Sequence, residues 1–134
     1  MAARPVAVTE RAGAARSVTV GPHRVIADEP VPVGADTGPA PFELVLAGLG
    51  ACTSMTLRMY AERHDWPLRE VRVRLRLDGP AVVTEISLDG DLRDDQRRAL
   101  VSVADRCPVH RFLGSPVPIV TVPTEEGGDA RCTR

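Results

Sequence analysis

A single long helical pattern constrains this fold more than any other feature of the sequence. Between residues 41 and 64, apolar side chains recur every three to four positions, the spacing of one face of an α-helix. Pro41 and Glu43 stand where a helix start favours proline and acidic residues, and Trp66-Pro67 marks an end. The stripe predicted for this helix consists of Phe42, Val45, Leu46, Leu49, Cys52, Met55, Thr56, Met59 and Tyr60.

Segments that alternate between apolar and polar residues flank the predicted helix on both sides. Such alternation is typical of half-buried strands, and Gly21-Pro22 and 78–80 have the composition of hairpin turns. The predicted strands cover 5–9, 17–20, 24–27, 71–77, 82–89 and 117–122. Asp94 is a suitable N-cap for a second helix over about 94–105. The pattern predicts a mixture of helices and strands.

Length and composition narrow the class of protein. The chain has 134 residues, no internal repeat and no change of composition, so we expect one domain over 1–134 with a flexible tail from about 124. Its 17 basic residues, all arginine, balance 18 acidic ones, and only 3% of residues are aromatic, which argues against a nucleic-acid partner. By inspection of the sequence, no apolar run reaches the roughly 18 residues that span a membrane, and no secretory signal is recognised, so a cytoplasmic protein without membrane contact is expected.

Two of the three cysteines are candidates for chemistry. Cys52 lies on the apolar stripe, where a lone cysteine is most often an inert small hydrophobe. Cys107 precedes Pro108, a pattern that places a cysteine at the N-cap of a short helix and favours its thiolate form. The alternative is that Cys107 caps a helix by chance. Cys132 lies in the predicted tail and is interpreted as incidental.

Metal, nucleotide and hydrolase signals are weak. His110 follows Cys107 by three positions and would give half of a metal site. The other histidines, His23 and His64, belong to different predicted elements, whereas a structural zinc site needs four ligands. No GxGxxG, P-loop, GxSxG or HExxH motif occurs. We therefore expect neither a metal nor a bound cofactor.

Two segments resemble motifs of the OsmC/Ohr family. Residues 38–61, in which Gly48 and Gly50 precede Cys52, are similar to the family's cysteine helix, and 106–111 (RCPVHR) to its second-cysteine motif. The cysteines stand 55 positions apart, and the resemblance extends from about 27 to 122, nearest to the OsmC-like branch with a CPVH motif. It implies an α+β fold with β-sheets around two central helices, built as an intertwined homodimer. The two glycines fit the close packing of such a dimer.

The resemblance also implies a thiol peroxidase that acts on organic hydroperoxides. Cys52 would attack the distal peroxide oxygen and become a sulfenic acid, and Cys107 would resolve it as a disulfide. An external dithiol, such as a lipoyl-bearing protein, would restore the thiols. In the family each active site lies at the subunit interface. There an arginine from the N-terminal strands stabilises the thiolate, and a glutamate at the start of the cysteine helix orients the arginine.

The positions of that arginine and glutamate are ambiguous in this chain. In the Ohr branch the glutamate stands ten positions before the peroxidatic cysteine, where this chain has Phe42. Glu43 stands nine before, and one residue rotates a helical side chain by about 100°. Glu43 therefore either orients the arginine by another route or only complements the helix dipole. Arg11 is the preferred arginine, and the alternatives are Arg16 and Arg24.

A different function remains open on the same scaffold. The two cysteines could form a redox sensor, or the cleft could bind a small apolar ligand; a dimeric interaction protein with inert thiols is a third reading. Thiol reactivity separates these readings. A peroxidase forms a Cys52–Cys107 disulfide with one equivalent of hydroperoxide, and its apolar surroundings favour alkyl or fatty-acid peroxides over hydrogen peroxide.

Overall fold

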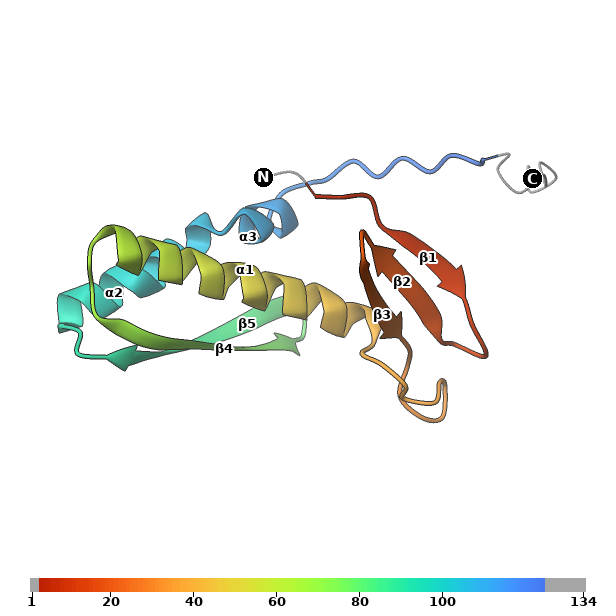
Figure 1. Ribbon diagram of the computed structural model, residues 1–134, viewed down its shortest axis with the longest axis horizontal. Helices are drawn as coiled ribbons and strands as arrows, with labels where there is room; N and C mark the ends of the chain where they lie inside the picture. The colour runs from red at the N-terminus through yellow and green to blue at the C-terminus, as the bar shows by residue number, and fades with distance from the viewer. Residues whose placement is uncertain (1–2, 125–134) are drawn as a thin grey trace.

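The computed structural model describes residues 3–124, which form two antiparallel sheets and one long helix with two shorter ones (Figure 1). This confirms the α+β class. Cys132 and the predicted tail beyond residue 124 lie outside the described residues. The elements are β1 (Ala7–Glu10), β2 (Arg16–Val20), β3 (His23–Ala27), α1 (Pro41–Arg63), β4 (Leu68–Asp78), β5 (Ala81–Gly90), α2 (Asp94–Val103), a 3₁₀ turn η1 (Ala104–Arg106) and α3 (Pro108–Leu113).

The N-terminal sheet is a simple meander of β1, β2 and β3. Both pairs are antiparallel, and Gly21 at positive φ forms the tight turn between β2 and β3. The sheet lies beyond the N-terminal end of α1, away from the β4–β5 hairpin (Figure 1). Its principal contacts are internal. The apolar side chains of Val8 and Val25 therefore remain exposed.

The second sheet is the β4–β5 hairpin, which packs against α1. Its register places Arg74 opposite Glu85. The side chain of Leu75 packs closely on Gly50, where a Cβ atom would stand 2.6 Å from Leu75 Cδ1. Close packing is therefore found at Gly50, whereas a Cβ atom at Gly48 would meet nothing within 4 Å. The core below α1 consists of Leu57, Ala61, Leu68, Leu92 and Leu100.

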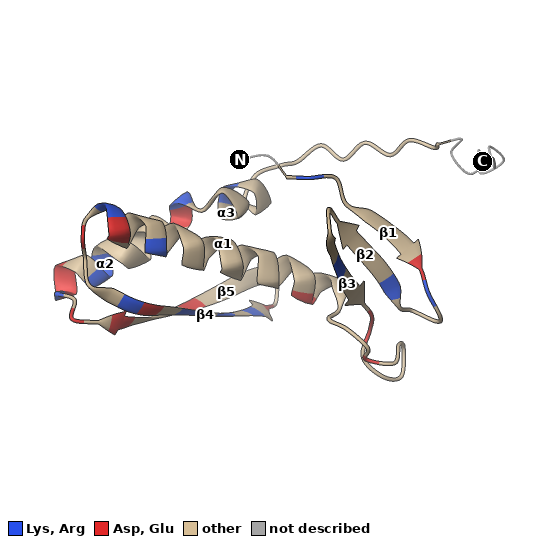
Figure 2. Cartoon of the chain, in the orientation of Figure 1, with Lys and Arg blue, Asp and Glu red and all other residues tan. Residues whose placement is uncertain are grey.

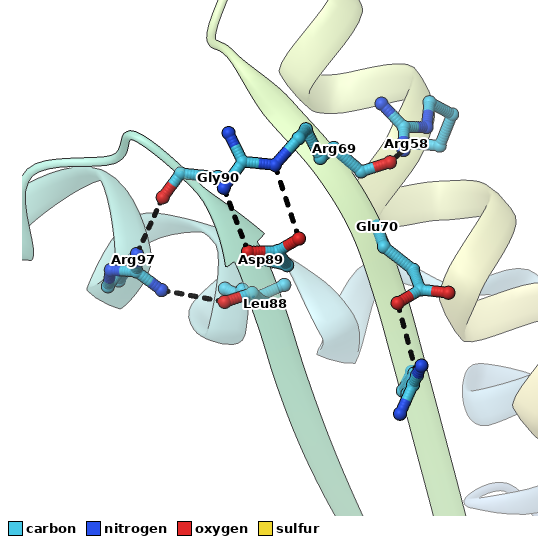
Figure 3. A network of polar contacts seen from close by, with 8 residues as sticks. Arg58, Arg69, Glu70, Leu88, Asp89, Gly90 and Arg97 are labelled. Atoms are coloured by element: carbon cyan, nitrogen blue, oxygen red, sulfur yellow. Dashed lines mark hydrogen bonds and ion pairs between the residues drawn. The ribbon is translucent and has the colours of Figure 1, made fainter.

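Two arginines fasten the hairpin to the helices (Figure 3). Arg58 of α1 donates to the carbonyl oxygens of Leu68 and Arg69, at 2.7 and 3.0 Å. Arg97 of α2 donates to the carbonyls of Leu88 and Gly90, both at 2.8 Å. Each guanidinium uses its fork geometry to satisfy two backbone acceptors at the end of a strand.

An aromatic cluster closes the C-terminal end of α1. The ring of Tyr60 stacks on His64 at a centroid distance of 4.2 Å and meets the edge of Trp66 at 5.6 Å. His64 and Trp66 are 5.0 Å apart. Tyr60 and Trp66 also pack against the core cluster. The cluster therefore joins the end of α1 to the start of β4.

The buried face of α1 differs from the predicted stripe. The side of α1 that is buried within the chain consists of Leu49, Gly50, Thr53, Leu57 and Ala61. Most of the large apolar residues of the predicted stripe face outward instead: Phe42 is 72% exposed and Met55 64%. Helix α1 thus has two apolar faces, of which this chain covers one.

By length and composition alone α1 could cross a membrane, contrary to the expectation from the sequence. The helix has 23 residues, and an 18-residue window within it reaches a mean hydropathy of 1.2. However, the core helix of a soluble protein passes the same test. Helix α1 packs on β4, α2 and α3, which is the arrangement of a central helix in a soluble fold.

The strand predicted over 117–122 is wrong for this chain. After α3 the backbone runs as a drawn-out coil without a ladder partner (Figure 1). Ile119, Val120 and Val122 are exposed at 87%, 82% and 72%. The residues have strand propensity, but Pro118 removes a donor and no sheet edge lies beside them.

Asp28 organises the loop between β3 and α1. Its buried carboxylate accepts hydrogen bonds from the backbone N–H groups of Glu29 (2.8 Å), Ala35 (3.3 Å) and Thr37 (3.1 Å), and from the Thr37 hydroxyl (2.6 Å). These bonds, that of the Thr37 hydroxyl above all, lower the pKa of Asp28 to about 2. One carboxylate therefore holds together three positions of the loop, at Glu29, Ala35 and Thr37.

The bonds to Asp28 predict an acid-sensitive loop. The folded-state pKa of about 2 lies below the roughly 3.9 of an unfolded aspartate, so the stabilisation is complete above about pH 4. It is lost as the pH falls from about 4 towards 2. In urea unfolding, Asp28→Asn should be less stable than the wild type at pH 6, and the difference should shrink below pH 4. Asp36→Asn serves as the control, because asparagine tolerates the positive φ there. An equal deficit of Asp28→Asn at pH 6 and pH 2.5 would contradict this assignment.

Candidate active site

The structure brings Cys52 and Cys107 into contact. Cys52 lies half-buried in the middle of α1, and Cys107 is fully buried. Cys107 is the N-cap of α3 and Pro108 its first residue, as the sequence predicts. The 3₁₀ turn η1 directly precedes Cys107, and α3 packs against α1. The two thiols, 55 positions apart in the chain, therefore interact where α1 and α3 are in contact.

Four features of its surroundings shift the pKa of the Cys52 thiol. Burial raises its pKa above the ordinary value, and the hydrogen bond with the Cys107 thiol raises it further. The backbone N–H of Val109 and the hydroxyl of Thr56 act in the opposite direction. In this chain taken alone, the balance favours the neutral thiol. Sequence reasoning placed Thr56 on the stripe but missed its contact with the thiol, although its position one turn after Cys52 was the available signal.

An apolar cavity of about 560 Å³ gives access to Cys52. Gly48 lies in its wall one turn before Cys52, and a Cβ atom there would meet nothing within 4 Å. The missing side chain therefore leaves the approach to the sulfur open. The other lining residues are Ala3, Leu44, Val45, Pro108, Val109, Phe112 and Leu113.

Glu43 lies at the start of α1 and does not line this cavity. Its carboxylate accepts a hydrogen bond from the backbone N–H of Ala40 at 2.8 Å, so it caps the first turn. The sequence left two roles open for Glu43, one at the helix start and one in orienting the catalytic arginine. The bond to Ala40 is a contact of the first kind. The middle of α1 carries no charged side chain, and its charged residues gather towards the ends (Figure 2).

The three candidate arginines all lie in the N-terminal sheet. Arg11, in the turn between β1 and β2, lines a separate cavity of about 590 Å³. Arg16 donates to the Gly13 carbonyl at 2.9 Å and forms an ion pair with Glu10. Arg24 donates to the Ser17 hydroxyl at 2.9 Å. None of the three lines the cysteine cavity, so the described chain does not place an N-terminal guanidinium beside Cys52.

Among residues 3–124, no group of three or more His, Cys, Asp and Glu side chains could hold a metal ion. His110 instead approaches Asp105 at 4.0 Å.

Comparison with known families identifies the class of this protein. The family described as OsmC-like protein matches residues 34–122, which include both cysteines. The chain therefore belongs to the OsmC-like family. No curated protein sequence matches it significantly.

Solved structures share the fold at low sequence identity. An OsmC-like protein from Mycoplasma pneumoniae has a TM-score of 0.70 at 14% identity, covering 83% of this chain and 86% of that one. The organic hydroperoxide resistance protein OsmC from Legionella pneumophila has a TM-score of 0.61 at 21% identity, and the match covers 84% of this chain and 91% of that one. The organic hydroperoxide resistance protein OhrB of Bacillus subtilis has a TM-score of 0.53 at 24% identity, and the match covers 81% of this chain and 89% of that one.

Proposed function

We propose that this protein is a thiol-dependent peroxidase that reduces organic hydroperoxides through Cys52 and Cys107. The observation that carries the proposal is the contact between a cavity-facing thiol and a buried second thiol. This pair has the arrangement that a peroxidatic and a resolving cysteine need. The names of the Legionella and Bacillus proteins, which refer to organic hydroperoxide resistance, support the same function.

The reaction has three steps. The Cys52 thiolate attacks the distal oxygen of ROOH, the O–O bond breaks, and the products are a Cys52 sulfenic acid and, after protonation, ROH. The Cys107 thiol then attacks the sulfenic sulfur, which forms the disulfide and releases water. An external dithiol, such as a lipoyl-bearing protein, reduces the disulfide and leaves as its own disulfide. The two electrons that reduce the peroxide thus come from the dithiol.

The apolar cavity supports organic rather than inorganic peroxides as substrates. The alkyl group of an organic peroxide would bury apolar surface of Leu44, Val45 and Phe112, which favours binding. Hydrogen peroxide has no alkyl group and gains nothing from these residues. The expected preference is therefore for alkyl and fatty-acid hydroperoxides. The reaction needs no cofactor, and we assign it to the cytoplasm.

We further propose that the protein works as an intertwined homodimer. Three surfaces remain uncovered in one chain: the outer face of α1, the N-terminal sheet and the segment 117–122. A second copy that supplied a sheet edge would let 117–122 form the strand its composition favours. A second copy could also bring Arg11 to Cys52, where a cation would lower the thiol pKa that burial raises.

Thiol mapping tests the peroxidase. One equivalent of cumene hydroperoxide should convert the reduced protein to a species lighter by two hydrogens, with the new bond between Cys52 and Cys107. The conversion should be faster than with hydrogen peroxide. If both thiols stay reduced, the proposal is wrong, and the apolar cavity beside Cys52 would then favour a module that binds a small apolar ligand.

A further inference from the structure

A second cavity adjoins the cysteine cavity along α1. It has a volume of about 220 Å³ and lies between the C-terminal half of α1 and the η1–α3 corner. Pro108 lines both cavities, and Thr56, which contacts the Cys52 thiol, lines the second. The two cavities therefore adjoin at Pro108, the residue that follows Cys107. A long ligand that reached Cys52 could occupy both.

The two cavities differ in chemistry. The cysteine cavity is walled by aliphatic and aromatic side chains and has no charged residue in its lining. The second cavity is lined by Arg63 from the last turn of α1 and Arg106 from η1. Within residues 3–124, neither guanidinium has an ion pair or a side-chain hydrogen bond, whereas many other arginines of the chain do. Two cations without such a partner therefore line the second cavity, next to the uncharged cysteine cavity.

We propose that Arg63 and Arg106 form an anion subsite that binds the carboxylate of an amphipathic hydroperoxide. The alkyl tail of that substrate occupies the cysteine cavity, and its peroxide group lies between the two ends at Cys52. A guanidinium matches a carboxylate because it presents two parallel N–H donors. This inference rests on the proposed peroxidase and narrows its substrates to acids.

The spacing along α1 sets the position of the peroxide group in the substrate. Arg63 follows Cys52 by eleven positions, which corresponds to about 16 Å along the helix axis. Helical side chains lean towards the N-terminus, so we expect the Arg63 guanidinium to reach back towards Cys52. A carbon chain must therefore separate the carboxylate from the peroxide. A long-chain fatty acid with a mid-chain hydroperoxide has this form.

The test compares linoleic acid hydroperoxide with its methyl ester. The two probes differ only in the carboxylate, so the ratio of their rate constants for Cys52 oxidation isolates the anion subsite. We expect the wild type to react about five- to tenfold faster with the acid at low ionic strength. Added salt should reduce the ratio, because both arginines are exposed.

Single substitutions show which arginines cause the preference for the acid over the ester. Arg63→Gln and Arg106→Gln should each lower the acid-to-ester ratio towards one. Arg74→Gln is the matched control: it removes the same charge from the outer face of β4, outside both cavities, and should keep the wild-type ratio. All three variants should react normally with cumene hydroperoxide, which carries no charge. A ratio near one in the wild type, or an unchanged ratio in both variants, would overturn the subsite.

Binding of linoleate itself separates this inference from the peroxidase. Titration calorimetry of linoleate and methyl linoleate requires no thiol chemistry. Tighter binding of linoleate, lost in Arg63→Gln and Arg106→Gln, would support the subsite even if cumene hydroperoxide leaves Cys52 reduced. Equal binding of acid and ester would exclude the subsite even if Cys52 proves peroxidatic.

Discussion

Replacing Cys52 with serine should reduce the turnover of organic hydroperoxides to the uncatalysed background. A serine hydroxyl has nearly the size of a thiol but is not ionised near neutral pH, and no base within the described cavity would activate it. The loss should therefore appear in kcat rather than in the affinity for substrate. The measurement is steady-state peroxide consumption with a dithiol as the electron donor.

The other two cysteines provide the controls for this result. Cys107→Ser should still reduce one equivalent of peroxide, but the product should stall as a Cys52 sulfenic acid that a dimedone probe traps. Cys132→Ser should behave as the wild type. Full activity of a folded Cys52→Ser protein would end the peroxidase proposal, and loss of activity in Cys132→Ser would show that the cysteine pair is wrongly assigned.

A charge on the outer face of α1 should separate the proposed dimer into monomers. Met55 is 64% exposed in one chain and lies in the middle of that face. In a symmetric dimer one substitution changes both copies, so Met55→Glu would bury two unpaired carboxylates. We expect the dissociation constant to rise by at least about a hundredfold, since each 1.4 kcal/mol changes it tenfold.

Sedimentation equilibrium measures this change directly. The wild type should have twice the 14.4 kDa mass of the chain, and Met55→Glu should approach 14.4 kDa. Ser102→Glu, on the exposed side of α2, adds the same charge elsewhere and should leave the dimer intact. A monomeric wild type at all concentrations would contradict the homodimer. If the dimer also provides the arginine, Met55→Glu should lose peroxidase activity as well.

Local chemistry made several features predictable from the sequence. Helix α1 begins at Pro41 and ends one residue before the predicted position, because proline, an acidic first turn and Trp66-Pro67 act within a few residues. Cys107 at the N-cap of α3 follows for the same reason, since a Cys-Pro pair is compatible with few other local conformations. The hairpin of β4 and β5 follows from strict alternation around Gly79.

Features that depend on distant contacts were less predictable. The periodicity of α1 could not show which of two apolar faces β4 would cover, and it favoured the outer one. Residues 117–122 have a strand composition, but a strand also needs a free edge beside it. The roles of Arg11 and Glu43 remain predictions, because their relation to Cys52 depends on an assembly beyond one chain. No local signal distinguished Asp28 from the other acidic residues.

The aromatic cluster at the end of α1 gives the protein an intrinsic fluorescence probe. Trp66 is the only tryptophan and Tyr60 the only tyrosine, and their rings are 5.6 Å apart. Energy absorbed by the tyrosine should therefore pass efficiently to the tryptophan while the α1–β4 junction is folded. Tyr60 also lines the cavity that contains Arg63 and Arg106. The emission of this unlabelled chain should thus respond both to unfolding and to the arrival of a ligand beside the cysteines.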